Sequence, residues 1–401
     1  MNMQWIDGGV TAAAGFQASG VSAGIKKSRK PDLALVMSDA PAAAAAVFTN
    51  NRVQAPPVVM SKERIRSGRA QAVLINSGCA NCMTGAAGRA DALRLSRELA
   101  RRLDIAERDV LLASTGIIGR RLPVPRILKA IPKLIRLLHM AHHRDAAVAM
   151  MTTDLKPKEV AVETRMKGRM CRVGGMAKGA GMIAPSMATM LAVVTTDAKI
   201  APALLRRLLR KVSARTFNAI SIDGDMSTND TVFALASGRS GVVVTPGSEA
   251  ARGFAQMLEA VCARLAMMIV KDGEGATRIM QVHVVGARTA REAAAAARQV
   301  AYSPLVKTML AGGDPNVGRI AAAVGASTAV FHPDRLEMCI GQTRVVHRGV
   351  ACTLSASVAT HLLSAPEVTV RIDLHAGQAE GWMATCDFTE EYVRINARYS
   401  T

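Results

Sequence analysis

Aromatic residues are scarce in this sequence. Phe, Trp and Tyr together make up 3% of its 401 residues. Proteins that bind single-stranded nucleic acids stack bases on aromatic side chains, so the composition argues against that class. Apolar residues account for 50% of the chain and charged residues for 20%. These proportions exclude an intrinsically disordered chain, because enough apolar surface is present to form a large core.

Segments that would carry the chain into or across a membrane are also lacking. The N-terminal stretch has Asp7 and no basic residue before its apolar part, unlike a secretory signal. The longest nearly apolar stretch, residues 182–194, falls short of the roughly 20 residues that a membrane-spanning helix needs. Seven scattered cysteines, an odd number, favour reduced thiols over a disulfide framework. We therefore expect a cytoplasmic protein with no membrane partner.

Patterns for metal or nucleotide binding are weak. His139, His142 and His143 are clustered, and Cys79 and Cys82 form one C-x-x-C pair, but no second pair stands at the spacing that zinc needs. We predict no metal site, with the histidines solvated late in a helix and the thiols in a turn. The phosphate-loop motif G-x-x-x-x-G-K-[ST] is absent, and no G-x-G-x-x-G leads from a strand into a helix. The sequence therefore predicts no nucleotide cofactor.

Positive charge is in excess, because 51 Lys and Arg residues stand against 31 acidic residues, a net charge of +20. A helix predicted over residues 201–215 carries part of this charge, but leucines alternate with its basic residues. That pattern is typical of a helix with one solvated face and one core-facing face. We predict no nucleic-acid partner, and duplex binding is kept as an alternative that a steep salt dependence would support.

Apolar periodicity predicts alternating strands and helices. Strands are expected at residues 72–76, 110–113, 189–196, 241–244 and 279–285, and in the C-terminal part at 367–374, 381–388 and 392–396. Helices are expected at residues 87–103, 124–139, 201–215, 248–268 and 318–325, with Pro132 kinking or dividing the second. Residues 160–173 indicate a hairpin that turns at Lys167–Gly168. We expect a mixed α/β (α+β) protein with antiparallel pairing, because many connections are short.

Residues 174–194, GGMAKGAGMIAPSMATMLAVV, are the most informative stretch. Small residues and Pro185 lead to Thr189 at the start of an apolar strand. One interpretation is a loop that enters a core strand. The other is that the Ala188–Thr189 bond is cut, so that the new amine of Thr189, with a pKa of about 8, serves as the base for its own hydroxyl. The residues alone leave both interpretations open.

Eight motifs in order along the chain resemble the ornithine acetyltransferase family, also called the bifunctional glutamate N-acetyltransferase of arginine biosynthesis. They are NSGCANCMTG, STGIIG, MMTTD, KGAGMIAPSMATML, DGDMSTNDT, KDGEGATR, GDPNVGRI and YVRINARYST. The similarity runs from GFQASGVSAGIK near the N-terminus to Thr401. One such motif would be weak evidence, but eight in the family order are highly specific.

The resemblance implies an αββα sandwich with a smaller C-terminal α/β region, made as a precursor that cuts itself. The family is cleaved before the Thr of its MATML motif, which is Thr189 here, so the bond cut is Ala188–Thr189. An α chain of residues 1–188 and a β chain of residues 189–401 are then expected. The two chains are expected to assemble as an α2β2 heterotetramer.

The resemblance also implies the reaction. Thr189 takes the acetyl group from N2-acetylornithine and passes it to glutamate, a ping-pong transfer with an oxyanion hole at Thr115 and Gly116. The implied substrate-binding residues are Thr152, Lys178, Thr189, Glu274, Asn396 and Thr401. No cofactor is implied, and acetyl-CoA is left open as a second acetyl donor. An aminopeptidase or amidase of the related fold is the alternative, disfavoured because YVRINARYST and KDGEGATR match the transferase motifs.

Overall fold

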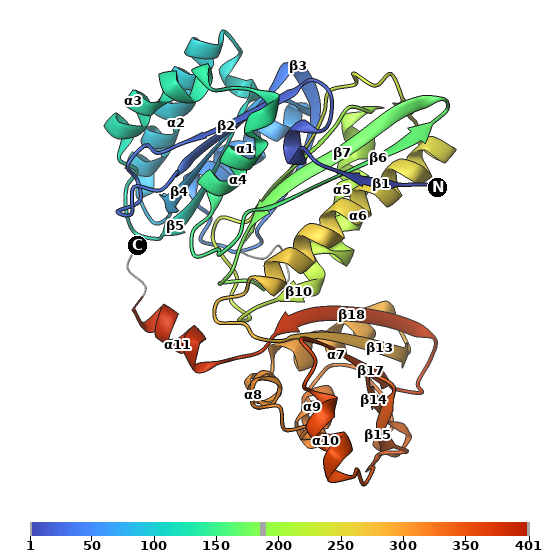
Figure 1. The fold of residues 1–401 in the computed structure, drawn as a ribbon. Coiled ribbons are helices and arrows are strands. Elements are labelled where there is room, and N and C mark those ends of the chain that lie inside the picture. The colour runs from blue at the N-terminus through green and yellow to red at the C-terminus, as the bar shows by residue number, and fades with distance from the viewer. Residues whose placement is uncertain (1, 185–189, 399–401) are drawn as a thin grey trace. The chain divides into compact units, whose positions relative to one another are not determined.

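The structure, a computed structural model, describes residues 2–184 and 190–398 (Figure 1). The chain forms two compact units. The first contains the described residues up to Asn218 together with Asp225–Ile269, and the second contains Ala219–Gly224 and the described residues from Val270 onwards. Ala188, Thr189 and Thr401 lie outside the described residues. The expected division into residues 1–188 and 189–401 therefore falls inside the first unit and does not coincide with the boundary between units.

A nine-stranded sheet forms the centre of the first unit. Its spatial order is β1 (Gln4–Ile6), β6 (Lys158–Met166), β7 (Arg169–Lys178), β8 (Leu191–Thr196), β11 (Thr231–Ala236), β3 (Leu33–Phe48), β4 (Arg69–Cys79) and β5 (Val110–Ile117), with β2 (Phe16–Val21) paired to β3. The β4–β5 and β8–β11 pairs are parallel and the other pairs are antiparallel. The long strand β3 joins the two halves, because its first part pairs with β2 and its last part with β11.

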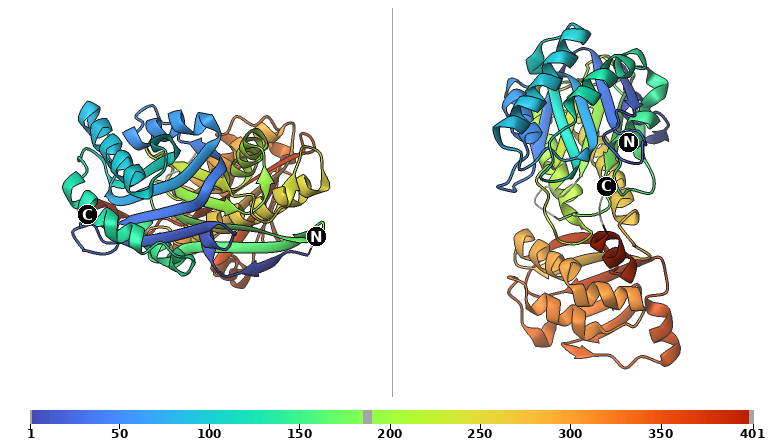
Figure 2. Two further views of the ribbon diagram at one scale, coloured as in Figure 1. Left: turned by 90° about the horizontal axis from the view of Figure 1, so that it is seen from above. Right: turned by 90° about the vertical axis from the view of Figure 1, so that its left-hand side faces the viewer.

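A shared core lies between the two halves of this sheet. It unites Val73 of β4 and Leu111 of β5 with Val193 of β8 and Phe233 of β11, together with buried alanines of α4 (His143–Met150). The outer face of the β3–β5 half is covered by α1 (Pro56–Arg64), α2 (Gly85–Leu103) and α3 (Val124–Arg136). On the other half lie α5 (Pro202–Arg215) and α6 (Glu249–Lys271) (Figures 1 and 2). These layers form the predicted αββα sandwich.

The helix α6 is long and apolar enough to cross a membrane by length and composition, and 56% of its most apolar window is buried inside the protein. Its Val261 and Leu265 pack so closely on β7 that a Cβ on Gly175 would lie 3.2 and 3.0 Å from their methyl groups. The helix α5 likewise buries Leu204, Leu205 and Leu209. Both helices therefore use their apolar faces to cover the sheet. A small two-stranded sheet, β9 (Lys199–Ile200) with β12 (Val243–Val244), completes this unit.

The second unit is a seven-stranded sheet covered by helices. Its order is β10 (Ile220–Ser221), β18 (Ala379–Cys386), β13 (Ile279–Ala287), β17 (Glu367–Asp373), β14 (Glu337–Ile340), β15 (Thr343–His347) and β16 (Val350–Ala351). Its helices are α7 (Ala290–Tyr302), α8 (Pro304–Gly312), α9 (Val317–Gly325), α10 (Ala356–Leu362) and α11 (Glu390–Ala397). The alanine-rich α7 packs tightly on β18, since a Cβ on Gly381 would lie 2.7 Å from the nitrogen of Ala294.

Several sequence predictions need correction. Residues 392–396 are part of the helix α11 and not a strand, because Glu390 and Glu391 favour a helix N-terminus and Glu391 pairs with Arg394 one turn later. The strand β5 continues through Thr115 and Gly116, because it pairs with β4 over its whole length. Pro132 does not divide α3. The expected antiparallel pairing is confirmed for most strand pairs of the two large sheets, although each sheet also contains two parallel pairs.

The histidine cluster also differs from the prediction. The helix α3 ends at Arg136, His139 precedes a short turn of 3₁₀ helix, and His143 opens α4. The Nδ1 atom of His143 lies 2.7 Å from the carboxylate of Glu159, so this histidine is a hydrogen-bond partner of Glu159 and not a solvated residue late in a helix. Across residues 2–184 and 190–398, no group of three or more potential metal ligands is found.

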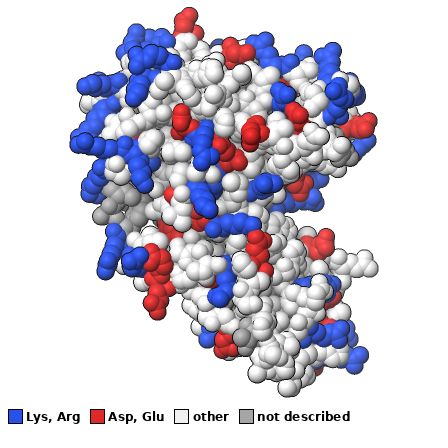
Figure 3. Space-filling view, viewed as in Figure 1, with Lys and Arg blue, Asp and Glu red and all other residues white. Residues whose placement is uncertain are grey.

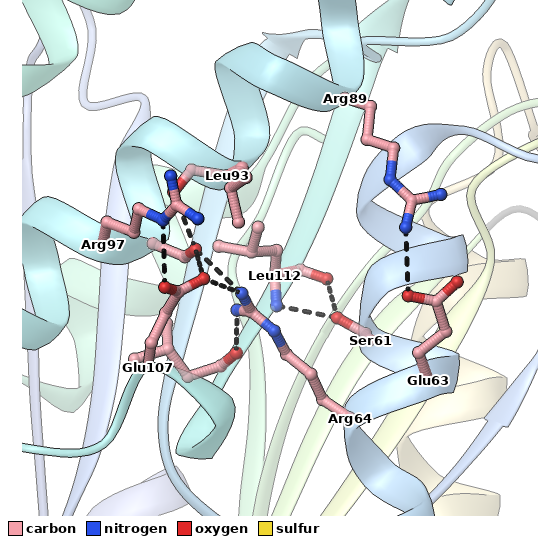
Figure 4. Close-up of polar contacts among 10 residues, drawn as sticks. Ser61, Glu63, Arg64, Arg89, Leu93, Arg97, Glu107 and Leu112 are labelled. Atoms are coloured by element: carbon pink, nitrogen blue, oxygen red, sulfur yellow. Dashed lines mark hydrogen bonds and ion pairs between the residues drawn. The ribbon is translucent and has the colours of Figure 1, made fainter. Parts of the chain in front are cut away.

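The helix α1 anchors β5, the strand that carries Thr115 and Gly116. The hydroxyl of Ser61 accepts a hydrogen bond from the Leu112 N–H and donates one to the Leu112 carbonyl, both at 2.8 Å (Figure 4). Arg64 donates to the carbonyl of Val110 at 2.7 Å and lies 2.6 Å from the carboxylate of Glu107. Elsewhere on this unit, Lys and Arg side chains gather over α2 and α3 (Figure 3).

Candidate active site

The strands β4 and β5 end side by side in a polar segment. Their register pairs Asn76 with Ser114, Ser77 with Thr115 and Gly78 with Gly116, where the pairing becomes irregular. Gly116 has φ 126°, and a Cβ there would overlap the carbonyl carbon of Gly78. Glycine is therefore required at position 116 both by backbone conformation and by the close approach of β4. The result is a buried Thr115 beside a backbone that no larger residue could adopt.

A buried carboxylate, Asp154, organises the neighbouring polar residues. Its oxygens accept hydrogen bonds from the backbone N–H of Thr152 at 2.9 Å and of Gly179 at 2.6 Å. The ammonium of Lys158 lies 2.7 Å from it and that of Lys178 lies 4.0 Å away. Burial acts to raise the pKa of Asp154, but the charges of Lys178 and Lys158 and these hydrogen bonds outweigh it and hold the pKa well below its ordinary value.

Lys178 links this carboxylate to the oxyanion motif. Its side chain is 4% exposed, and its ammonium lies 3.4 Å from the hydroxyl of Thr115. The ammonium groups of Lys158 and Lys178 both face the carboxylate of Asp154, and the charge of Lys178 also acts to lower the pKa of Asp230. Burial lowers the pKa of Lys26 to about 8. The charges of Asp154 and Lys178 also act on this pKa, Asp154 raising it and Lys178 lowering it.

Two further predicted residues lie together in the second unit. The carboxylate of Glu274 accepts a hydrogen bond of 2.8 Å from the side-chain amide of Asn396. Glu274 is 8% exposed, and no cation of the described chain lies within ion-pair distance of it. A buried carboxylate paired with a neutral amide favours a cationic ligand.

The helix α11 positions Asn396 against Glu274. The Asn396 amide also donates to the Tyr392 carbonyl at 3.1 Å, and the Tyr392 ring packs on Phe388 with centroids 4.5 Å apart. The Tyr392 hydroxyl donates to Asp223 at 3.2 Å. The loop of Glu274 touches this helix directly, because a Cβ on Gly275 would lie 2.6 Å from the nitrogen of Tyr392.

The structure thus brings Thr115, Gly116 and Lys178 together, and connects Thr152 to them through Asp154. Glu274 and Asn396 meet each other in the second unit. Four buried residues for which the sequence predicted no role also belong here: Asp154, Lys158, Asn229 and Asp230. A signal was available for three of them, since Asp154 ends the MMTTD motif and Asn229 and Asp230 lie in DGDMSTNDT.

A family model and two full-length relatives match this chain. Residues 17–401 match the model of the ArgJ family. The arginine biosynthesis bifunctional protein ArgJ of Geobacter sulfurreducens is 48% identical over 389 residues, which cover 96% of this chain and 99% of that protein. The glutamate N-acetyltransferase of Methanocaldococcus jannaschii is 45% identical over 411 residues, 100% of both chains.

A solved structure is also similar. It is the crystal structure of ornithine acetyltransferase complexed with ornithine from Mycobacterium tuberculosis, 42% identical, with a TM-score of 0.44, covering 46% of this chain and 99% of that one. The matches of the family model and of the two full-length relatives extend over nearly all of the sequence. This chain therefore belongs to the ArgJ family.

Proposed function

We propose that this chain is a glutamate N-acetyltransferase of arginine biosynthesis that takes its acetyl group from N2-acetylornithine. The observation that carries the proposal is the 48% identity, over 96% of the chain, to a relative named for arginine biosynthesis. The buried lysines beside Thr115 and the buried Glu274 support it, because the substrates are small amino acids that carry both carboxylate and amine groups.

The proposed transfer runs through an ester on Thr189. The Thr189 hydroxyl gives its proton to the Thr189 amine and attacks the acetyl carbonyl, and the oxyanion forms at Thr115 and Gly116. The bond between the acetyl carbon and the ornithine nitrogen then breaks, and that nitrogen leaves with the proton. Glutamate attacks the acetyl ester in the reverse sense, which restores the Thr189 hydroxyl and yields N-acetylglutamate.

The charges of the proposed substrate-binding residues suggest which substrate group each of them contacts. Lys178 would attract a substrate carboxylate, because its buried ammonium lies 3.4 Å from the Thr115 hydroxyl of the proposed oxyanion motif. Glu274 would attract the side-chain ammonium of ornithine, while Thr152, Asn396 and Thr401 would offer neutral hydrogen bonds. Lys178→Met is expected to raise KM for both substrates, whereas Glu274→Gln should raise KM mainly for N-acetylornithine.

The product distinguishes this transferase from the related hydrolases. The purified protein is mixed with N-acetylornithine labelled in its acetyl group and with glutamate, and the products are separated by mass. Labelled N-acetylglutamate is the expected product. Labelled acetate without N-acetylglutamate would instead identify an aminopeptidase or amidase that uses the same nucleophile.

Cleavage before Thr189 is part of the same proposal and is tested by intact mass and N-terminal sequencing. We expect an α chain of residues 1–188 and a β chain that begins at Thr189, assembled as α2β2 by native mass. Thr189→Ala should leave one uncut, inactive chain. Thr196→Ala, which removes a buried hydroxyl from the strand β8, should still be cut. An uncut but active wild-type chain would contradict both the cleavage and the mechanism.

The second acetyl donor is tested separately. Relatives of similar identity are named both as a bifunctional protein and as a glutamate N-acetyltransferase. The proposed mechanism needs no cofactor, and acetyl-CoA enters only as an alternative substrate. Formation of N-acetylglutamate from acetyl-CoA and glutamate, in the absence of N-acetylornithine, would mark this chain as bifunctional.

A further inference from the structure

A run of buried polar residues, Ser227–Thr231, lies in the first unit and has no assigned role in the acetyl transfer. All five side chains are between 1% and 7% exposed. Burying polar groups costs free energy unless each finds a hydrogen-bond partner, so the partners show what the segment does. The backbone carbonyls of this segment are held by Thr49, whose hydroxyl donates to Ser227, and by the N–H of Ala55, which donates to Thr228.

The side chain of Asn229 ties the segment to the ends of β4 and β5. Its amide nitrogen donates to the carbonyl of Ala80, just after β4, at 2.8 Å. It also donates to the carbonyl of Ser114, the residue before Thr115, at 2.9 Å. Its amide oxygen accepts from the hydroxyl of Thr228 at 2.6 Å. All the hydrogen-bonding groups of this amide are therefore engaged, and two of the bonds clamp the strand ends around the oxyanion motif.

The next residue, Asp230, binds Met190, the residue just before β8. One carboxylate oxygen accepts from the backbone N–H of Met190 at 3.1 Å, and the N–H of Thr231 donates to the Met190 carbonyl at 3.1 Å. Both backbone groups of Met190 are thus bound by adjacent residues of one segment. Met190 follows Thr189 in the chain, so three covalent bonds separate its nitrogen from the amine of Thr189.

One buried segment therefore contacts both the strand that carries Thr115 and the residue that follows Thr189 in the chain. Asn229 reaches β5 one residue before Thr115, and Asp230 reaches the residue that follows Thr189. The distance between a nucleophile and its oxyanion donors decides the rate, since displacement by about 1 Å can cost ~10²-fold. By bonding both Ser114 of β5 and Met190, the segment limits how far these two parts of the chain can move apart.

We propose that Asn229 and Asp230 are positioning residues of the active site, Asn229 for the oxyanion strand β5 and Asp230 for Met190, the residue that follows the proposed nucleophile in the chain. The inference rests on the proposed function, because it assigns these residues a part in the acetyl transfer at Thr189. Each acts through a hydrogen bond to the backbone: Asn229 donates, and Asp230 accepts. Neither needs to exchange a proton with the substrate.

The first test removes the clamp on β5. In Asn229→Ala, kcat for acetyl transfer should fall about tenfold, less than the ~10²–10³ lost when an oxyanion donor is deleted outright. KM should stay near wild type, because the oxyanion exists only in the transition state. Ser61→Ala is the matched control: it removes buried hydrogen bonds to β5 at Leu112, upstream of the motif, and should lower the melting temperature but leave kcat unchanged.

The second test separates positioning from acid–base chemistry at Asp230. Burial raises the pKa of this carboxyl well above its ordinary value, against the Met190 hydrogen bond and the charge of Lys178, so an uncharged isostere is a fair replacement. Asp230→Asn keeps an oxygen that accepts from Met190 and should retain most of kcat and of the rate of chain cleavage. Asp230→Ala loses that acceptor and should slow both.

The wild-type activity shows whether a negative result in these variants contradicts the positioning roles or the proposed function. If wild type makes no N-acetylglutamate, the function itself is wrong. If wild type is active and Asn229→Ala retains its kcat, or if Asp230→Asn is as inactive as Asp230→Ala, the positioning roles are wrong. Should Asn229→Ala not fold, Asn229→Ser replaces it in the test. Its hydroxyl can donate to only one of the Ala80 and Ser114 carbonyls, so its kcat should be lower than that of wild type. Should Asp230→Ala not fold, the near-wild-type kcat expected of Asp230→Asn still decides the second test.

Discussion

At the scale of single residues, the active-site region depends on a buried charge network centred on one aspartate. Asp154 faces Lys158 at 2.7 Å and Lys178 at 4.0 Å, and all three side chains are nearly inaccessible to solvent. Removing one partner of a buried ion pair leaves an uncompensated charge, which is far more costly than breaking a pair at the surface. Asp154 is therefore expected to matter for stability as much as for substrate binding.

The Asp154→Asn variant tests this network. It should lower the free energy of unfolding at pH 7 by about 3–5 kcal/mol, the usual cost of breaking a buried pair. The pKa of Asp154 is depressed in the folded state, so its contribution is complete above the unfolded value of about 4 and is lost as pH falls below it. Denaturant titrations at several pH values should therefore show that the difference in free energy of unfolding between wild type and Asp154→Asn becomes smaller as the pH falls.

The control for this prediction is Glu63→Gln. The Glu63–Arg89 pair of Figure 4 is roughly half exposed on both sides, and a surface pair contributes about 0–1 kcal/mol. If the difference in free energy of unfolding between wild type and Asp154→Asn stayed constant from neutral to strongly acidic pH, the depressed pKa of Asp154 would not contribute to stability as argued.

At the scale of elements, the helix α11 shows how tertiary contacts decide a local structure. Tyr392, Val393 and Ile395 favour a strand by composition, which is why the sequence predicts a strand at residues 392–396. The segment is a helix whose N-terminal turn carries Glu390 and Glu391. The helical conformation also places the Tyr392 nitrogen against Gly275 and the Asn396 amide on Glu274.

Gly275→Ala tests whether the contact of α11 with Gly275 and Glu274 is needed for substrate binding. Gly275 has φ 70°, and the added Cβ would lie 2.6 Å from the nitrogen of Tyr392 and 2.9 Å from the Thr389 hydroxyl, so α11 must shift. Displacing α11 moves Asn396 away from Glu274, both of them proposed substrate-binding residues, so KM for N-acetylornithine should rise while kcat changes little. Steady-state kinetics at saturating glutamate measure both constants.

A matched glycine in the same unit is the control. For Gly312, at the end of α8, no atom of the described residues outside its chain neighbours and its own helix backbone lies within 4 Å of an added Cβ. Gly312→Ala should leave KM and kcat as in wild type. Equal effects of the two substitutions would mean that the position of α11 does not govern binding.

At the scale of the whole molecule, the proposed cut would separate segments that share one sheet. β7 precedes the cut and β8 follows it, and the two pair from Val173 with Thr196 to Lys178 with Leu191. β8 also pairs with β11, which in turn pairs with β3. The two strands that follow the cut thus lie between β7 and β3, which both precede it.

This interleaving predicts that cleavage does not release the chains. The α and β chains should migrate as one species in native gel filtration and appear as two bands only after denaturation. Exchange with separately expressed α chain should be negligible without denaturant, because it would require breaking the β7–β8 and β11–β3 pairings together. Separate elution of the two chains in native buffer would contradict the sheet order.

The sequence by itself determined the family and most of the elements. The helix at 85–103, the hairpin turning at Lys167–Gly168 and the strand at 279–287 follow from local periodicity and turn residues, which act over a few neighbours. The motifs named the oxyanion pair Thr115 and Gly116, Lys178, Glu274 and Asn396 as candidates, although their roles stay predictions.

Only the tertiary structure decided what those residues touch. The close approach of Gly116 to Gly78, the two lysines on Asp154 and the clamp of Asn229 on Ser114 join residues that are between 4 and 115 positions apart in sequence. No local pattern reports such contacts, because burial and strand pairing across the chain create them. The same reason explains α11, where docking on Gly275 and favourable charges at the helix start outweighed the strand preference of its residues.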